Sequence, residues 1–270
     1  MTQLGQYEKK LFSKNRQNIV LITEEGARKH SIHALIEVDV TKAREIIHKY
    51  KLEGSREISF TGWLIKCIAQ AVSEHKELNT YRLGKRKTVV FDDVDIPIPV
   101  ERNVDGETIP MGYVLRKANE KNVDEITREI RDIQKEDVDG TTQVLGGNLT
   151  RLEKIILNAP LFVKKLALFI VRRNGLFKKK HLGTVGVTAI GMMGKFPGWV
   201  IPMGGATTTI LAVGGIRKKP GVVNDEIKIR EYLSLTVTVN HDVVDGGPLV
   251  RFVERLTELI ESAYELSYER

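Results

Sequence analysis

Residues 233–263 constrain the fold most, because they read as a strand, a polar turn and a helix in immediate succession. The β-branched run at residues 233–239 predicts a strand, and the polar residues 240–247 end it. Pro248 stands where a helix begins, since its fixed φ and missing N–H cost nothing in a first turn. Apolar residues then recur at helical spacing: Leu249, Phe252, Val253, Leu256, Leu259, Ile260 and Ala263. The turn is therefore expected to be held between two packed elements.

His241 stands in this turn, in the pattern His-x-x-x-Asp-Gly that ends at Gly246. A histidine suits proton transfer near neutral pH, and a rigid loop can aim it into a cleft. The carboxylate of Asp245 can brace the loop or pair with a cation behind the imidazole. The same pattern is typical of a surface turn in which Asp and Gly make the bend and the histidine is solvated. Two interpretations follow from the pattern alone, a general base and a solvated turn.

The remaining chain alternates strand-like and helix-like segments. Strands are predicted at residues 31–40, 88–91, 94–100, 109–115, 183–190, 207–213 and 227–239, with a further short strand suggested at 18–23. Helices are predicted at residues 41–51, 59–75, 122–135, 152–157, 160–173 and 248–263. Thr41 and either Ser59 or Thr61 are expected as helix N-caps. Gly214 and Gly215 are interpreted as a hairpin turn.

Several of these segments, in this order, resemble blocks of one known family. The blocks are Glu37-Val-Asp-Val-Thr-Lys, Phe60-Thr-Gly-Trp-Leu-Ile-Lys-Cys-Ile-Ala, Val94-Asp-Ile-Pro-Ile-Pro-Val and Gly183-Thr-Val-Gly-Val-Thr-Ala-Ile-Gly. Together with the histidine pattern, they resemble the catalytic core of the dihydrolipoamide acyltransferases of the 2-oxo-acid dehydrogenase complexes. That family is related to chloramphenicol acetyltransferase. The resemblance covers most of residues 33–265 and implies a chloramphenicol acetyltransferase-like α/β fold, a two-layer sandwich with a mixed β-sheet.

The resemblance also implies a domain organisation. Residues 1–30 are basic and weakly patterned and are expected to form an N-terminal arm, followed by an acyltransferase catalytic domain at residues 31–270. Residues 141–180 depart most from the family and are expected to be a helical insertion. The family's large enzymes carry a lipoyl domain and a subunit-binding domain before the core. This sequence has no segment for either, so a free-standing catalytic domain with an external acyl carrier is expected.

Three site residues are carried over from the family. His241 is the expected general base, Asp245 the structural carboxylate of its loop, and Thr188 matches a serine whose hydroxyl faces the reacting carbonyl. A preplaced donor to the oxyanion is worth about 3–4 kcal/mol of barrier, and threonine offers the same donor as serine. The alternative for Thr188 is a β-branched residue that simply suits a strand. In the family the histidine and the hydroxyl come from neighbouring subunits of a trimer.

Two further features of the turn bear on its ion pairing. In the family an arginine near the N-terminus meets the carboxylate of the turn, and Arg16 and Arg28 are the candidates here, each also interpretable as a solvated surface arginine. Asn240 stands before His241, where the family often has Asp or His. Asp242 stands after it, where the family often has Arg. Asp242 therefore replaces a cation beside the base with an anion.

The charge and composition of the chain indicate which kinds of binding partner it favours. The net charge of +7 and the pI near 9.3 favour anionic partners, such as a nucleotide-bearing cofactor or a phospholipid surface. The chain has no recognisable nucleic-acid motif, no metal-ligand spacing and no apolar stretch of the ~18 residues that a membrane span needs. Cys67 is the single cysteine, which excludes an internal disulfide and fits a reducing, cytoplasmic compartment. It is expected to be a packed core thiol.

The predicted helix at residues 160–173 has two interpretations. Its apolar residues are Leu161, Phe162, Leu166, Leu168, Phe169 and Ile170, and cations gather in and after it. One interpretation is an interfacial membrane helix or a collar for an anionic ligand. The other, expected here, is an amphipathic helix packed on the subunit with a solvated basic face.

The resemblance implies an acyltransferase that moves an acyl group between a thioester and a thiol or hydroxyl acceptor. The thioester is expected to be acyl-CoA or acyl-lipoamide. Coenzyme A or acyl-CoA is the expected co-substrate, and a lipoyl group is expected only on a separate protein. The expected assembly is a homotrimer or a larger shell of trimers. Two alternatives stay open: an inactive trimeric scaffold or regulatory relative, and an O-acetyltransferase acting on a small hydroxyl compound.

Overall fold

A computed structural model describes residues 5–12, 14–104, 107–135, 155–156, 159–189, 191 and 196–266. The elements are, in order, α1 (Lys14–Gly26), β1 (Ser31–Asp39), α2 (Thr41–Glu53), α3 (Phe60–Glu74), the short 3-10 helix η1 (Lys76–Asn79), β2 (Thr80–Leu83), β3 (Lys87–Val90), β4 (Ile96–Val104), β5 (Glu107–Leu115), α4 (Val123–Lys135), α6 (Leu161–Val171), α7 (Gly175–Leu182), β6 (Val185–Thr188), β7 (Thr209–Val223), β8 (Glu226–Asn240) and α8 (Gly246–Glu261).

The main sheet places β8 between β1 and β7, with β6 beyond β7. The β1–β8 and β7–β8 pairs are antiparallel and the β6–β7 pair is parallel, so the sheet is mixed as expected. Residues alternate along β8: Leu233, Leu235, Val237 and Val239 are fully buried, and the residues between them carry hydroxyl groups. Two shorter ladders, β2–β3 and β4–β5, complete the strands of the described residues.

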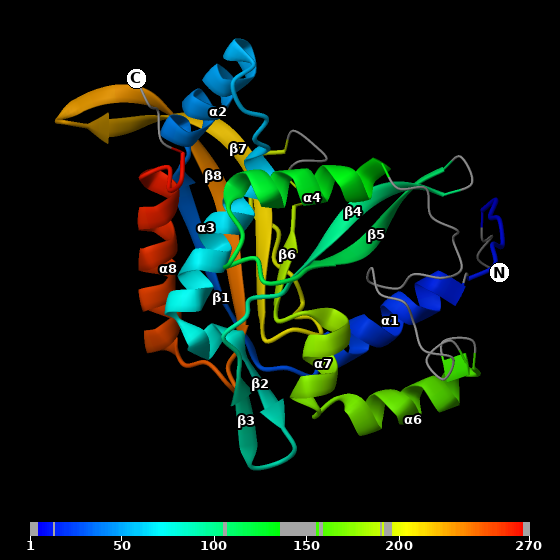
Figure 1. Ribbon diagram of the computed structural model, residues 1–270. Coiled ribbons are helices and arrows are strands. Elements are labelled where there is room, and N and C mark those ends of the chain that lie inside the picture. The colour runs from blue at the N-terminus through cyan, green and yellow to red at the C-terminus, as the bar shows by residue number, and fades with distance from the viewer. Residues whose placement is uncertain are drawn as a thin grey trace.

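Helices α3 and α8 cover the apolar face of the main sheet, with α2 at one end of it (Figure 1). Trp63 on α3 and Phe252 on α8 are fully buried, and the indole N–H of Trp63 donates to the carbonyl oxygen of Tyr264 at 3.0 Å. Each such side chain contributes about 1.5–3 kcal/mol by leaving water. Cys67 is buried in the same layer, as predicted, and burial raises the pKa of its thiol. This layer fixes the strand that ends at the histidine turn.

Local signals explain where several helices begin and end. Ser59 caps α3 by accepting a hydrogen bond from the backbone N–H of Gly62 at 2.9 Å. Gly54 ends α2 with a φ of 63°, a conformation that glycine adopts without strain. Asn122 and Glu125 exchange side-chain-to-backbone hydrogen bonds at the start of α4, which forms a capping box. Thr41 makes no such cap; its hydroxyl donates to Asp39 instead.

Two predictions about backbone path are wrong. Residues 18–23 belong to helix α1 and form no strand, because the helix turns Leu21 into the interior, where it is only 6% exposed. Gly214 and Gly215 form no hairpin turn: β7 runs through them with a register shift between Val213 and Ile216. A Cβ on Gly215 would stand 1.8 Å from the carbonyl oxygen of Phe196, so the two glycines let the loop after β6 lie directly against the strand.

Helix α6 departs from its expected packing. Five of its apolar side chains are exposed, namely Leu161, Phe162, Leu166, Phe169 and Ile170, whereas Lys164 is only 7% exposed. The expected packed apolar face with a solvated basic face is therefore wrong for this chain. Figure 1 shows α6 at the lower edge of the molecule, away from the sheet and its helices. Most of the helix predicted at residues 152–157 lies outside the described residues.

Candidate functional site

His241 follows the last residue of β8 and is held by its backbone. Its N–H donates to the carbonyl oxygen of His30 at 2.7 Å, and the N–H of Asn240 donates to that of Thr208 at 2.9 Å. The imidazole remains 47% exposed, with Nδ1 at 3.6 Å from Oδ1 of Asp245. The Asp245 carboxylate is 84% exposed and caps no backbone N–H of α8. The turn thus presents a solvent-accessible imidazole with a carboxylate behind one ring nitrogen.

Asp242 ties the turn to two distant segments. Its Oδ1 lies 2.8 Å from Nδ1 of His30, and its Oδ2 lies 3.4 Å from Nη1 of Arg82. The His30 hydrogen bond, with the charge of Arg82 behind it, holds the pKa of the Asp242 carboxyl below its usual range. The sequence pointed to Arg16 and Arg28 as partners of the turn and missed His30 and Arg82. No local pattern marks these two residues, because only the fold brings them to residue 242.

Thr188 lies at a different level of the sheet from His241. It pairs with Ala212 on β7, which pairs with Thr236 on β8. His241 is five residues beyond Thr236 along the chain, and Thr188 lies two strands away from Thr236 across the sheet. Together these offsets separate the backbones of Thr188 and His241 by about 20 Å. The sheet therefore does not bring the two predicted groups together within one chain. Thr236 lies between them in register, and its buried hydroxyl has no hydrogen-bond partner among the described residues.

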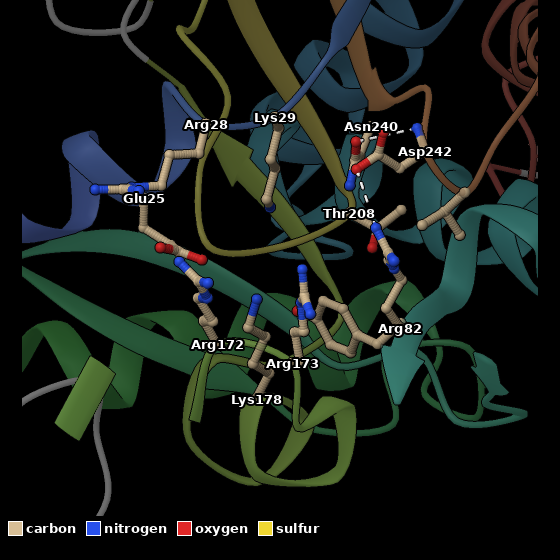
Figure 2. Close-up of a pocket in the computed structure, with 12 residues that line it drawn as sticks. Glu25, Arg28, Lys29, Arg82, Arg172, Arg173, Lys178, Thr208, Asn240 and Asp242 are labelled. Atoms are coloured by element: carbon tan, nitrogen blue, oxygen red, sulfur yellow. Dashed lines mark hydrogen bonds and ion pairs between the residues drawn. The ribbon is translucent and has the colours of Figure 1, made fainter. Parts of the chain in front are cut away.

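A cleft of about 400 Å³ opens beside the histidine turn. It lies between α1, β2, the end of α6, α7 and the end of β8, and Figure 2 shows its charged side chains around a common space. The lining residues are Glu25, Arg28, Lys29, Tyr81, Arg82, Arg172, Arg173, Lys178, Thr208, Asn240, Asp242 and Val243. Six of them are Lys or Arg and two are acidic. An anion is the ligand that such a cleft favours.

Lys29 is the most perturbed cation of this cleft. Its Nζ donates to the carbonyl oxygen of Thr207, and its pKa falls to about 7, first because the amine is buried and then because Lys178 is near. Burial also lowers the pKa of Lys178. A bound anion would offset both effects, since it favours the charged amines. The described residues contain no group of three or more His, Cys, Asp or Glu side chains placed to hold a metal ion.

The fold and the site together define a class: a mixed-sheet α/β domain with an accessible histidine beside a cationic cleft. Comparison with known families identifies the class further. The chain belongs to the family of 2-oxoacid dehydrogenases acyltransferase (catalytic domain), whose profile matches residues 8–150 and 172–268. This is the family that the sequence predicted. Residues 151–171, which include all of α6, lie outside the match.

Curated relatives agree with this family. The chain is 26% identical over 237 residues to the lipoamide acyltransferase component of the branched-chain alpha-keto acid dehydrogenase complex of Bacillus subtilis, covering 86% of this chain and 46% of that one. It is 25% identical over 226 residues to the dihydrolipoyllysine-residue acetyltransferase component of the pyruvate dehydrogenase complex of Mycoplasma genitalium, covering 83% and 49%. The chain thus spans about half the length of these relatives.

Solved structures confirm the predicted fold class. A probable dihydrolipoamide acetyltransferase from Listeria monocytogenes has a TM-score of 0.70 at 20% identity, with 98% of each chain covered. The dihydrolipoamide acetyltransferase of Azotobacter vinelandii has a TM-score of 0.69 at 14% identity, covering 98% of this chain and 96% of that one. In the Azotobacter enzyme, a serine, a histidine and an asparagine four residues after it have been investigated for roles in the catalytic mechanism.

Proposed function

We propose that this chain transfers an acyl group between a thioester and a thiol or hydroxyl acceptor, with His241 as the general base. One observation carries the proposal: His241 is a solvent-accessible histidine at a strand end, directly beside the cationic cleft. Its two chain neighbours, Asn240 and Asp242, both line that cleft. The family of the chain suggests the type of reaction, which is acyl transfer. The spacing of His241 and Asp245 equals that of the histidine and the asparagine in the Azotobacter enzyme.

In the proposed reaction, the imidazole of His241 removes the proton of the acceptor thiol or hydroxyl. The acceptor sulfur or oxygen then attacks the acyl carbonyl carbon, and the carbonyl oxygen gains the negative charge. The hydroxyl of Thr188 donates a hydrogen bond to this oxyanion. The intermediate collapses as the donor thiolate leaves, and the imidazolium returns its proton to that thiolate. Protons and charges balance without any metal ion.

The separation of Thr188 and His241 within the sheet supports a site shared between subunits. About 20 Å between the backbones exceeds what two side chains can span. We therefore propose a homotrimer, or a larger shell of trimers, in which Thr188 of one subunit faces His241 of its neighbour. A structurally similar protein forms the cubic core of a pyruvate dehydrogenase multienzyme complex.

Coenzyme A or its acyl thioester is the proposed co-substrate, and the cationic cleft is its proposed docking place. Arg82, Arg173 and Lys178 are suited to phosphate groups, because guanidinium and ammonium groups bind them through charge-assisted hydrogen bonds. A lipoyl group on a separate protein is the alternative acyl carrier, which the names of the relatives suggest. The single buried Cys67 fits a reducing cytoplasmic compartment.

A thiol-release assay with short-chain acyl-CoAs and dihydrolipoamide tests the proposal. His241→Ala is expected to lower kcat by a factor of about 10²–10⁴. The matched control is His48→Ala, which removes an exposed histidine on α2 and should leave the rate unchanged. Equal rates for His241→Ala and the wild type would exclude His241 as the base. If the wild type neither turns over any donor nor binds coenzyme A, the chain is a scaffold and the proposal fails.

A further inference from the structure

Helix α6 exposes a continuous apolar face. Its most exposed large side chains are Phe162 (72%), Ile170 (69%), Leu166 (60%) and Phe169 (60%). These positions fall on one side of the helix, because residues three, four, seven and eight apart share a face. The residues of α6 on its other side, which include Lys164, are buried or half-buried. Such a patch on a folded domain marks an interaction surface.

The segment that carries this face has charges of one sign only. Residues 159–182 contain seven Lys or Arg residues and no Asp or Glu. Lys165 and Arg172 flank the apolar face, and the Arg172 guanidinium lies 4.3 Å from the centre of the Phe169 ring. Lys165 also pairs with Glu24 of α1, which anchors the helix to the body. The surface therefore combines exposed aromatic and aliphatic groups with an excess of cations at their edge.

This combination fits an anionic lipid surface better than a second copy of the chain. Two copies meeting through this face would bring together the seven cations that each contributes from residues 159–182. Protein interfaces are also depleted in lysine at their cores. An interfacial membrane helix, by contrast, pairs a Phe- and Leu-rich face with Lys and Arg at the headgroups. At 11 residues α6 is about 16 Å long, which is too short to cross a bilayer.

Membrane-spanning segments do not explain the surface either. None of the helices in the described part of the chain has the length and apolar character that crossing a membrane requires. Since α6 also lies outside the residues that match the acyltransferase family, its exposed face is not explained by the common catalytic core. A helix that rests on the membrane surface needs only one apolar side and no great length.

We propose that α6 docks this protein on the surface of an anionic lipid bilayer. Phe162, Leu166 and Ile170 enter the boundary between headgroups and acyl chains, and the cations flanking them contact the anionic headgroups. The proposal is independent of the proposed function. It also has a geometric consequence, because Arg172 and Arg173 follow α6 directly and line the cationic cleft. In the docked protein the cleft opens beside the headgroup layer.

Vesicle flotation of the full chain tests the docking. Wild-type protein should float with vesicles of phosphatidylcholine mixed with phosphatidylglycerol, and much less with phosphatidylcholine alone. The double variant Phe162→Ser, Ile170→Ser should lose at least about tenfold in partitioning to the anionic vesicles. The matched control Ile227→Ser, Ile229→Ser removes side chains of 80% and 76% exposure from the β7–β8 hairpin and should float like the wild type. Thermal melts of both variants show whether they remain folded.

A second measurement separates insertion of α6 from adsorption of the basic surface. In a Phe162→Trp variant, the added indole should shift its emission to shorter wavelength on anionic vesicles and be quenched by brominated acyl chains. The proposal is overturned if the wild type stays with the lipid-free fraction, or if flotation occurs without quenching. It is also overturned if the Phe162→Ser, Ile170→Ser variant floats unchanged but has a smaller mass by light scattering, since the face then binds another copy of the chain.

Discussion

Two substitutions in separate chains will show whether one active site is shared between neighbouring subunits. His241→Ala removes the proposed base, and Thr188→Val removes the proposed oxyanion donor while keeping the shape of the side chain. Each variant alone should lose activity, by a factor of about 10²–10⁴ for the base and about 10²–10³ for the donor. Because the β6–β7–β8 register holds the two residues about 20 Å apart in one chain, they can meet only across an interface, and every interface in an assembly of one variant lacks one of them.

In the proposed trimer, mixing the two variants should restore one site. In a ring of three, whether it holds one chain of either variant and two of the other, one interface pairs an intact His241 with an intact Thr188. Co-expression with two different affinity tags and purification on both should therefore give trimers with about a third of the wild-type activity. Thr188→Ser, which keeps the hydroxyl, serves as the control and should retain most of the rate.

The result that refutes the shared site is equally definite. If doubly purified mixed trimers are no more active than the two variants assayed apart, the two groups do not meet across an interface. If Thr188→Val alone keeps wild-type activity, the threonine is a strand residue without a catalytic role. In either case the assignment of His241 is still tested separately by its own substitution.

Four further predictions concern the site and the fold. Lys29, whose pKa is lowered from 10.5 to about 7, should react with an amine-labelling reagent with a pH midpoint near 7, measured by peptide mass spectrometry. Between about pH 7 and 10.5 the unfolded chain binds the extra proton at this lysine, so the free energy of unfolding should rise with pH, and Lys29→Met should lessen that rise. Arg82→Gln should weaken coenzyme A binding by about three- to tenfold and reduce its salt dependence in calorimetric titrations, whereas Arg44→Gln on α2 should not. Ser59→Ala should lower the free energy of unfolding by about 1 kcal/mol in urea titrations, because the N–H of Gly62 loses its cap; an unchanged value would show that water replaces the hydroxyl without loss.

Periodicity along the chain was enough to predict most elements of the core. The β-branched run that ends β8 and the helical spacing in α8 were both correct, although α8 begins at Gly246, two residues before Pro248. Buried side chains recur every three or four residues in a helix and every two residues in a strand, and a sequence displays these spacings directly. The run at residues 18–23 misled because its β-branched residues suit a strand, whereas tertiary packing favours a helix there.

The site was less predictable than the core. His241 could be proposed as the base from sequence because it belongs to a local pattern at a strand end, and that assignment stays a prediction. The cleft beside it could not, since Lys29, Arg82 and Lys178 come from three separate segments and no spacing relates them. The replacement of a turn by a bulge at Gly214 was also invisible, because it depends on a loop that lies against the strand. Arrangements of this kind arise from tertiary contact alone.

The contact of His30 with the histidine turn has a practical consequence for shortening the protein. The backbone carbonyl oxygen of His30 accepts a hydrogen bond from the N–H of His241, and the Asp242 carboxylate accepts one from the His30 ring. Arg28 and Lys29, which directly precede His30, line the cleft. A chain cut to begin at Ser31 would keep every strand of the main sheet. It would nevertheless lose the hydrogen bonds that His30 makes with the histidine turn, together with a third of the cleft's cations. Trimming to the main sheet would therefore remove α1 and the supports of the histidine turn.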